Sequence, residues 1–587
     1  MKFLNPTLRV LPCLFALTLS LPALCAPVRL VDQAPAKITN PVPGVILVDF
    51  ERVAFANLRL TPPAGSKQEV TIHFGEASTD GRINRKPPGT VRYASTKITL
   101  DGGQPVIAAP PADKRNTTHG SAIRTPKEWG VVLPFRWVEI EGWQGELKPS
   151  QITRQAAFAS TWNDDAANFK SSDPLLDRIW ELCRYSIKAT TFAGVYVDGD
   201  RERIPYEADA YINQLCHYYS DPDPQMARDT FDQLMKFPTW PTEWASHMIF
   251  MAHADWMRTG DTKWLASRYE ALKPKLLLDR AREDGLLVSN AAQVKRDDIV
   301  DWPAAERDGF QFKPVNTVVN AFHIRTLAMM ADLAQALKKD DEAADYRTKE
   351  SKARASFQEK LFDSTRGIFI DGEGSTHSSQ HANLFPLAFG LLPEKHQSSV
   401  TRQVVSRGMA CSVYAAQYLM EALFQNDAGT EALALILAPT DRSWKHMVES
   451  GTTISWEAWD QKYKPNQDWN HAWGAAPANI LPRFILGAEA AAPGWGTAHI
   501  RPQPCGLKSA EGKIPTPIGP VMVSWKNGNR FQFSVKLPGG MRAQIDLPAH
   551  EKSTGVFHNG KPIAAKRSGS RWLLEKTISG AIDLEVR

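Results

Sequence analysis

Two clusters of carboxylates beside aromatic side chains are the residues of this sequence that could carry out chemistry. The first cluster, residues 198–209 (DGDRERIPYEAD), contains Glu202, Tyr206 and Asp209. Pro205 suits the first turn of a helix, and if the helical twist extends back from there, the three side chains fall at i, i+4 and i+7 on one face. Two carboxylates, an aromatic ring and two arginines would then converge on one pocket. The alternative is a solvated, capped helix start with internal ion pairs.

The second cluster places a glutamate between two tryptophans. Residues 451–460 (GTTISWEAWD) contain Trp456, Glu457 and Trp459, and His471 follows at the start of the last predicted helix. Glycoside cleavage needs one carboxylic acid with a raised pKa to protonate the leaving oxygen, and a second carboxylate to activate water or attack the sugar. Carboxylates beside aromatic rings meet that need. The role of His471 stays open between capping the helix, packing under the pocket and binding a sugar hydroxyl.

Two further segments, residues 298–302 (DIVDW) and 240–244 (WPTEW), again pair a carboxylate with tryptophan on loops between helices. The chain has 18 Trp, which either fill large cores or stack on the C–H faces of sugars. Any one cluster is compatible with core packing or capping. The four together favour a site that cleaves carbohydrate.

Three regions of different periodicity must position these clusters. From about 28 to 165 the sequence has short β-rich runs divided by Pro, Gly and Asp turns. These runs lie at residues 45–50, 68–74, 96–100 and 135–140. Residues 105–126 are polar and rich in Pro, Ala and Thr, which is typical of a long exposed loop. After about 491 the β pattern returns, with turns typical of hairpins, at residues 497–501, 521–525, 531–537, 543–547 and 581–586.

The middle region is helical. Asp173 and Pro174 are a capping residue and a first-turn proline, and apolar residues then recur at helical spacing. Further helices are predicted at residues 206–219, 225–235, 244–258, 262–283, 318–337, 341–361, 379–391, 399–407, 414–424, 429–438 and 470–485. Roughly a dozen paired helices are what a barrel of six inner and six outer helices needs. An irregular α-bundle or a superhelical repeat gives the same count, although no fixed-period repeat is visible.

The sequence therefore predicts a multidomain α+β protein, with an (α/α)6 barrel catalytic domain flanked by N-terminal and C-terminal β-sandwich domains. The expected parts are a signal peptide (1–26), an N-terminal β-sandwich (27–168), the barrel (169–490) and a C-terminal β-sandwich (491–587). The leader has a basic start, a short apolar run and small residues near its end, which is typical of export to the periplasm or the medium. No later apolar run reaches the about 20 residues of a membrane span.

Composition argues against several other classes of function. The net charge is +5 over 587 residues, without a Lys/Arg-rich run, so no nucleic-acid partner is expected. Cys183, Cys216, Cys411 and Cys505 are far apart and lack zinc spacing, so no metal or other cofactor is expected. Cys183 and Cys216 could pair, but buried free thiols are favoured. The sequence carries no indication of an oligomeric state.

The two main clusters resemble motifs of glycoside hydrolase family 78, the α-L-rhamnosidases. The family's acid motif, approximately Asp-Cys-Pro-x-Arg-Glu-Arg-x-Gly-Trp-x-Gly-Asp, is similar to residues 198–209, and its Gly-x-Thr-Thr-x-Trp-Glu-x-Trp-Asp motif is similar to residues 451–460. The Asn-His pair at 470–471 and the Asp-Trp pair at 301–302 also agree, so the resemblance covers nearly all of residues 172–490. Here the first motif is one residue shorter, Gly-Asp replaces Cys-Pro and Pro-Tyr-Glu-Ala replaces Gly-Trp-x-Gly, which indicates a reshaped sugar pocket.

The resemblance implies an inverting exo-glycoside hydrolase that releases terminal α-L-rhamnose from a polysaccharide or glycoside. Glu202 would be the general acid, and Glu457 the general base that activates water. The resemblance and the clustering together suggest as substrate-binding residues Asp198, Arg203, Tyr206, Asp209, Asp301, Trp302, Trp456, Trp459 and His471. The partner would be a rhamnose-containing oligosaccharide or polysaccharide.

Two alternatives stay open. Another glycosidase or a lyase acting on a different sugar of an acidic polysaccharide could use the same helical domain. A lyase abstracts a proton, typically with Tyr or His, and does not need two opposed glutamates. A non-catalytic carbohydrate-binding protein would lose no function on Glu202→Gln, and the presence of both glutamates weighs against it.

Overall fold

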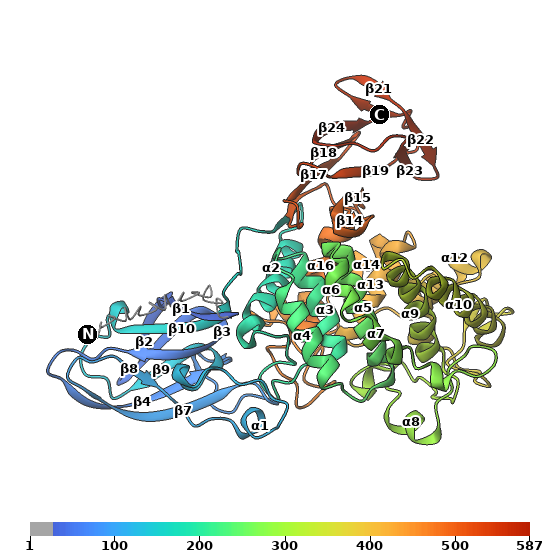
Figure 1. Ribbon diagram of the computed structural model, residues 1–587. Helices are drawn as coiled ribbons and strands as arrows, with labels where there is room; N and C mark the ends of the chain where they lie inside the picture. Colours follow the sequence, from blue (N-terminus) through green and yellow to red (C-terminus); the bar gives the residue numbers. More distant parts are fainter. Residues whose placement is uncertain (1–26) are drawn as a thin grey trace, which may run out of the picture.

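The computed structural model describes residues 27–587, which form an N-terminal β-domain, a helical domain and a C-terminal β-domain (Figure 1). The predicted order of β, helical and β regions is therefore confirmed. The helical domain lies in the middle, and the two β-domains project from it in different directions. The predicted signal peptide, residues 1–26, lies outside the described residues. Within residues 27–587, no helix combines the length and the apolar character that crossing a membrane requires.

The N-terminal β-domain is built on one eight-stranded sheet. Its strands are β1 (Val28–Gln33), β2 (Lys37–Val42), β3 (Val45–Leu60), β4 (Lys67–Gly75), β7 (Tyr93–Asp101), β8 (Val106–Ala108), β9 (Leu133–Glu141) and β10 (Ile152–Ala159). Six of them follow the order β1-β10-β3-β9-β4-β7, and β2 and β8 pair with the long β3. Val48, Val70 and Phe135 are fully buried in the core of this domain, as expected of strands with one covered face. A small hairpin of β5 (Ser78–Thr79) and β6 (Arg82–Ile83) follows β4.

The segment predicted as a long exposed loop, residues 105–126, is only partly exposed. It contains β8 and the short helix α1 (Lys114–Thr117), which Asp113 caps by accepting a hydrogen bond from the backbone N–H of Arg115. Asn116 in this helix is 3% exposed, because it contacts the helical domain. Composition predicts that the segment is polar, but not that another domain covers part of it.

Helices in successive pairs make up the middle domain. They are α2 (Pro174–Ala189), α3 (Glu207–Tyr218), α4 (Gln225–Lys236), α5 (Thr242–Thr259), α6 (Thr262–Ala266), α7 (Tyr269–Leu272), α8 (Ala291–Arg296), α9 (Thr317–Ala336), α10 (Asp340–Leu361), α11 (His381–Ala388), α12 (Gln397–Ser406), α13 (Val413–Gln425), α14 (Gly429–Ile436), α15 (Trp444–Glu449) and α16 (Pro477–Ile480). A hairpin of β12 (Phe362–Asp363) and β13 (Ile368–Phe369) follows α10. As predicted, Asp173 caps α2 by accepting a hydrogen bond from the Leu175 N–H, with Pro174 in the first turn.

Burial separates the inner helices from the outer ones. In α9, 15 of 20 residues are buried, whereas the following α10 has 5 of 22. Helix α9 is therefore enclosed by neighbours, and α10 covers it from outside. Helices α3, α5, α9, α11, α13 and α16 contact one another in this order, and α16 returns to α3. This succession of inner helices closes on itself.

The predicted helix over residues 262–283 is wrong in extent. The segment contains α6, α7 and two 3₁₀ turns. Pro274 lacks a backbone N–H, and Leu277 has a left-handed backbone (φ 54°), so a continuous helix cannot form. Helices α8 and α15 were not predicted, because six residues are too few to show a clear period.

The predicted helix over residues 470–485 begins later than expected and is irregular. It consists of a 3₁₀ turn (Ala472–Gly474), α16 and a π-helical turn (Leu481–Ile485). Prolines in α16 and in the π-helical turn withhold backbone donors. His471 is extended (φ −119°, ψ 104°) and therefore lies in a loop.

Two sheets form the C-terminal β-domain, with the orders β11-β16-β17-β18-β24-β20-β21 and β14-β15-β19-β23-β22. Their strands are β11 (Asn168–Ser171), β14 (Ala488–Ala490), β15 (Thr497–Ile500), β16 (Ser509–Ile514), β17 (Val521–Asn527), β18 (Phe531–Lys536), β19 (Arg542–Pro548), β20 (Val556–His558), β21 (Lys561–Ile563), β22 (Ala565–Ser568), β23 (Arg571–Leu574) and β24 (Ala581–Val586). Strand β11 comes from the segment that connects the N-terminal β-domain to α2, yet it pairs with β16. A local pattern cannot reveal such a distant partner.

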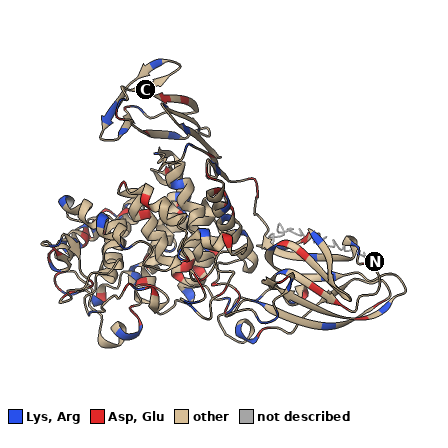
Figure 2. Cartoon of the chain, turned by 180° about the vertical axis from the view of Figure 1, so that it is seen from behind, with Lys and Arg blue, Asp and Glu red and all other residues tan. Residues whose placement is uncertain are grey.

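Charge is mixed over the whole molecule. Figure 2 shows Lys and Arg interspersed with Asp and Glu in all three domains, and the net charge of the chain is +5. The fields of neighbouring charges of opposite sign largely cancel at a distance, so specific local groups decide the electrostatics of any site.

Candidate active site

The loop that precedes α3 carries the first acidic cluster. Its ends are joined by hydrogen bonds from the Asp198 N–H to the Ile204 carbonyl (3.0 Å) and from the Ile204 N–H to the Asp198 carboxylate (2.8 Å). Helix α3 begins only at Glu207, and Tyr206 at its N-cap is extended. The expectation that Glu202 and Tyr206 share a helical face is therefore wrong, because the backbone forms this loop instead of a helical turn.

Arg201 links the two glutamates that the sequence singles out. Its Nε donates to Glu202 Oε1 at 2.6 Å, and its two Nη atoms donate to the two carboxylate oxygens of Glu457 at 2.9 and 3.0 Å. Arg201 and Glu457 are 256 residues apart in the chain, so only the tertiary fold brings them together. One planar guanidinium spans both carboxylates, so their nearest oxygens are at most about 8 Å apart.

Glu457 is buried, and its carboxylate is fully hydrogen-bonded. Besides Arg201, Oε1 contacts Lys464 Nζ at 3.1 Å, and Oε2 accepts a hydrogen bond from the Asp468 N–H at 3.1 Å. Burial by itself would raise the pKa of Glu457, but its neighbours His471, Arg201 and Lys464 outweigh burial and hold the pKa below its ordinary value. The carboxylate is therefore ionised at neutral pH, with two donors on each oxygen.

Asp198 and Glu202 are carboxyl groups that shift each other's pKa. Asp198 is 3% exposed, and burial together with the hydrogen-bonded Glu202 raises the pKa of Asp198 well above its ordinary range. Partial burial raises the pKa of Glu202, but hydrogen bonds from Asp198 and Arg201 outweigh it and lower that pKa to about 2. Two neighbouring carboxylates repel each other strongly when both are ionised. The two opposite pKa shifts favour a single proton on the pair, held by Asp198.

Three other predicted residues lie beside this pair. His471 Nε2 is 2.7 Å from Asp209 Oδ1, and both side chains are buried. Burial raises the pKa of Asp209, and the hydrogen bond to His471 opposes this shift. The ring of Tyr206 packs edge-to-face against Trp240 and Trp244, with centroid distances of 6.1 and 5.6 Å. The structure thus brings the members of the first cluster together with an aromatic group from the start of α5.

The two tryptophans that flank Glu457 have different surroundings. Trp456 stacks on Trp469 with ring centroids 5.1 Å apart, and among the described residues its buried indole N–H has no hydrogen-bond partner. Trp459 is fully buried, donates to the Cys411 carbonyl at 2.7 Å and packs edge-on against Trp444. Trp459 is therefore held by the core of the helical domain.

Asp301 lies at the centre of a buried hydrogen-bond network. Its Oδ2 contacts His381 Nε2 at 2.7 Å and accepts from the Ser412 N–H at 2.9 Å. Its Oδ1 accepts from the Ser412 hydroxyl and from the Trp302 N–H. Asp301 is fully buried, whereas Trp302 is 38% exposed. The carboxylate is engaged by the protein itself, and Trp302 is the member of this predicted pair that has free surface.

Replacing Asp301 with asparagine should lower the free energy of unfolding by about 2–4 kcal/mol, because an amide would face donors of His381 and Ser412 in a buried site. The midpoint of urea denaturation measures this loss. Asp32 pairs with Arg59 at a largely exposed position, so the control Asp32→Asn should cost less than about 1 kcal/mol. Equal midpoints for the two variants would contradict a stabilising role of the Asp301 network.

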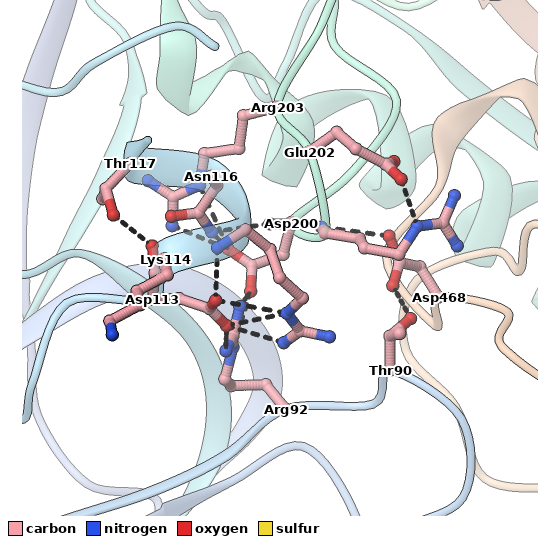
Figure 3. Close-up of polar contacts among 12 residues, drawn as sticks. Thr90, Arg92, Asp113, Lys114, Asn116, Thr117, Asp200, Glu202, Arg203 and Asp468 are labelled. Atoms are coloured by element: carbon pink, nitrogen blue, oxygen red, sulfur yellow. Dashed lines mark hydrogen bonds and ion pairs between the residues drawn. The ribbon is translucent and has the colours of Figure 1, made fainter. Parts of the chain in front are cut away.

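The N-terminal β-domain also reaches the site, which no sequence signal indicated. Figure 3 shows Arg92 pointing toward Asp200 and Thr90 toward Asp468. Arg203, predicted in the sugar pocket, instead donates to Asp200 Oδ1 at 2.7 Å and is buried at this domain contact. Arg92 and Thr90 come from a different domain than Asp200 and Asp468, so local spacing could not have identified these two pairs.

One set of side chains has the composition of a metal site. Glu457, Asp468 and His471 each place one possible ligand atom within 4.8 Å of the others. The cations of Arg201 and Lys464 already contact the Glu457 carboxylate. A metal ion would have to displace both of them against charge repulsion, so the arrangement suits acid–base chemistry by side chains.

Sequence comparisons match all three domains. The bacterial alpha-L-rhamnosidase 6 hairpin glycosidase domain matches residues 164–485, the concanavalin-like domain of the same group matches 39–158, and its C-terminal domain matches 487–561. An alpha-L-rhamnosidase of Alteromonas sp. (strain LOR) is 24% identical over 578 residues, which cover 91% of this chain and 59% of that protein. The chain therefore spans less than two thirds of the length of this relative.

Solved structures show the same fold. The alpha-L-rhamnosidase from Dictyoglumus thermophilum has a TM-score of 0.77 at 17% identity, covering 96% of this chain and 64% of that one. The Streptomyces avermitilis alpha-L-rhamnosidase complexed with L-rhamnose also has a TM-score of 0.77, at 18% identity, covering 95% of this chain and 54% of that one. Since the six-hairpin domain accounts for more than half of the residues, the chain belongs to glycoside hydrolase family 78, the bacterial α-L-rhamnosidases with a six-hairpin glycosidase domain.

Proposed function

We propose that the protein is an inverting exo-α-L-rhamnosidase that releases terminal rhamnose from a polysaccharide or glycoside. The observation that carries this proposal is the position of Glu202 and Glu457 on either side of one guanidinium group, that of Arg201. Inversion needs two carboxyl groups about 6.5–9.5 Å apart, which leaves room for a water molecule. The upper limit of about 8 Å set by the guanidinium is compatible with this range.

Glu202 is the proposed general acid, with Asp198 as the source of its proton. The buried pair holds one proton, and Glu202 is the more exposed member, because 31% of its side chain is accessible. When a glycosidic oxygen develops negative charge beside Glu202, the proton moves from Asp198 to Glu202 and on to that oxygen. Adding the leaving-group proton in this way is general acid catalysis.

Glu457 is the proposed general base. Both of its carboxylate oxygens have two donors in this structure, so a catalytic water requires that one donor withdraws. Arg201 is the donor proposed to withdraw, because it keeps its hydrogen bonds to Glu202 and to the Asn466 carbonyl when it leaves Glu457. In this proposal the bound sugar displaces Arg201 from Glu457 and water takes its place.

The sugar pocket is proposed to include Asp198 of the acid pair and, beside this pair, Tyr206, Asp209 and His471, with Trp302 and Trp456 as apolar contacts. Three predicted residues are proposed to support the pocket without contacting the sugar, because their polar groups already bond protein atoms. They are Arg203, Asp301 and Trp459. A rhamnose-containing glycoside is the proposed partner, in line with the L-rhamnose named for the Streptomyces avermitilis structure.

The proposal extends to the architecture and the location of the protein. The closed succession of inner helices supports an (α/α)6 barrel over residues 169–490. The β-domains over 27–168 and 491–587 are proposed to be β-sandwiches. Export to the periplasm or the medium, with removal of residues 1–26, would place the enzyme where polysaccharides are found.

The test is release of free rhamnose by the purified protein from p-nitrophenyl α-L-rhamnoside and from rhamnose-containing polysaccharides. We expect release from at least one of them, with the inverted anomer formed first in a proton NMR time course. A product that absorbs in the ultraviolet at a new double bond would favour a lyase instead. If no substrate yields rhamnose, the proposed function is wrong.

A further inference from the structure

We propose that Thr90 and Arg92 of the N-terminal β-domain are positioning residues. They hold two loops of the helical domain, that of Glu202 and that of Glu457, in a fixed position relative to each other. Both residues lie just before β7, in a segment that contacts the loop of Glu202 on one side and the loop of Glu457 on the other (Figure 3). The inference rests on the proposed function, since it names the residues that arrange its acid and base.

Arg92 fixes the loop of the acid. Its Nε donates to Asp200 Oδ2 at 2.6 Å, and a second N–H of the same guanidinium reaches the same oxygen. Asp200 is 1% exposed and stands two residues before Glu202. Asn116, from helix α1 of the same β-domain, donates to the Asp200 carbonyl at 2.7 Å. Two side chains of one domain thus hold both the carboxylate and the backbone of a residue in the other.

Thr90 fixes the loop of the base. Its hydroxyl contacts the Asp468 carboxylate, and its backbone N–H donates to the Gln467 carbonyl at 3.3 Å. Asp468 in turn accepts from the backbone N–H of Arg201 at 3.1 Å. Its own N–H donates to the Glu457 carboxylate at 3.1 Å, and its carbonyl accepts from the Glu457 N–H at 3.1 Å. A displacement of Thr90 is therefore passed through one residue to both glutamate loops.

The close approach of this segment to the loop of Glu457 favours glycine at position 89. A Cβ at Gly89 would lie 2.5 Å from Gln461 Nε2 and 3.0 Å from the carbonyl oxygens of Pro465 and Gln467. The backbone here also has a positive φ of 60°, which favours glycine. Both the backbone at Gly89 and the Thr90 hydroxyl therefore lie close to the loop of Glu457.

The contacts made by Thr90 and Arg92 are polar, whereas small apolar clusters, one with Phe55 stacked on Phe192, also join the two domains. Each domain has in addition an apolar core of its own. The core of the N-terminal β-domain, which includes Val48, Val70 and Phe135, is separate from the core of the helical domain. Loss of one polar contact between the domains therefore leaves both cores intact. Buried charged groups instead hold a defined geometry, because a misaligned partner leaves them unpaired.

The experiment compares Thr90→Val and Arg92→Met with matched controls in the same β-domain. The controls are Thr96→Val, which removes an exposed hydroxyl contact to the Ala109 carbonyl, and Arg59→Met, which removes a largely exposed ion pair with Asp32. With a cleaved rhamnoside, we expect kcat to fall about tenfold in Thr90→Val and about a hundredfold in Arg92→Met, with KM changed much less, because a shift of about 1 Å can cost a hundredfold in rate. Thr90→Ser, which keeps the hydroxyl, should restore most of the rate.

Hydrogen exchange provides a second readout that needs no substrate. We expect faster exchange in residues 198–206 and 460–471 of the two test variants, with unchanged exchange in the strands of the β-domain. This measurement decides the positioning role even if rhamnosides prove not to be substrates. The inference would be overturned if exchange in both loops stayed at the wild-type rate, if the control variants showed equal effects, or if exchange became faster over the whole β-domain. A kcat within twofold of wild type on an active substrate would also overturn it.

Discussion

Replacing Glu457 with glutamine will lower kcat for rhamnoside hydrolysis by about a thousandfold, within the range of about 10²–10⁴ that general base catalysis supplies. Glutamine has the same shape as glutamate, but it cannot take a proton from water. Single-turnover and steady-state rates on p-nitrophenyl α-L-rhamnoside measure the loss. Added azide, which attacks without a base, should recover part of the rate and give the inverted glycosyl azide.

A matched control separates this chemistry from lost stability, because Glu457→Gln also leaves Arg201 and Lys464 without their carboxylate. Glu421 is another buried glutamate of the helical domain and pairs with Arg483. Glu421→Gln should lower the unfolding midpoint while the folded protein keeps its kcat. If Glu457→Gln retains more than a tenth of the wild-type rate, Glu457 is not the base.

The same carboxylate predicts the acidic side of the pH profile. Burial raises the pKa of Glu457, but His471, Arg201 and Lys464 bring it below the ordinary 4.5. The base is active when ionised, so kcat/KM should be lost only as the pH falls through this lowered pKa. A profile that already declines from neutral pH to pH 5 would disagree with an ionised Glu457.

Replacing Glu202 with glutamine will have an effect that depends on the leaving group. We expect a loss of about a thousandfold with an oligosaccharide, whose leaving oxygen needs a proton, within the usual range for general acid catalysis. The loss should be roughly tenfold with p-nitrophenyl α-L-rhamnoside, because p-nitrophenolate leaves without protonation. Rhamnose release from both substrates under the same conditions gives the ratio.

Asp198→Asn tests the origin of that proton. An asparagine can donate to Glu202 but cannot hand over a proton, so this variant should show the same dependence on the leaving group. Glu181→Gln, which removes a partly exposed pair with Arg52, is the control and should leave both rates unchanged. Equal losses on the two substrates in Glu202→Gln would mean that Glu202 is not the acid.

Local patterns predicted the elements but not all of their ends. The alternation in residues 45–50 and 68–74 lies in β3 and β4, and the start of α2 agrees with its capping residue. Residues 262–283 were expected to form one helix, and a proline and a left-handed leucine divide it. Apolar spacing reports which face is covered, whereas backbone breaks depend on single residues whose effect is set by their neighbours.

Residue types predicted the members of the candidate site, and the contacts in the tertiary structure show how these members are arranged. The two glutamates, Asp209 and His471 were named from the carboxylate and aromatic clusters, and the structure places them around one arginine and one carboxyl pair. Asp301 carried the same sequence signal, yet its carboxylate is saturated by His381 and Ser412. A pattern of residue types cannot show which hydrogen-bond partners a carboxylate has.

The sequence alone determined the order of β and helical regions, the family motifs and the pair of glutamates, because periodicity and short motifs are carried by residues close together in the chain. The tertiary structure decided which partners each carboxylate has and that the N-terminal β-domain contacts the loop of Glu202 and the segment that follows Glu457. The contact of Arg201 with Glu457 and that of Thr90 with Asp468 join residues 256 and 378 positions apart. Charge, burial and hydrogen bonding at the site arise from such long-range contacts, which no local pattern contains.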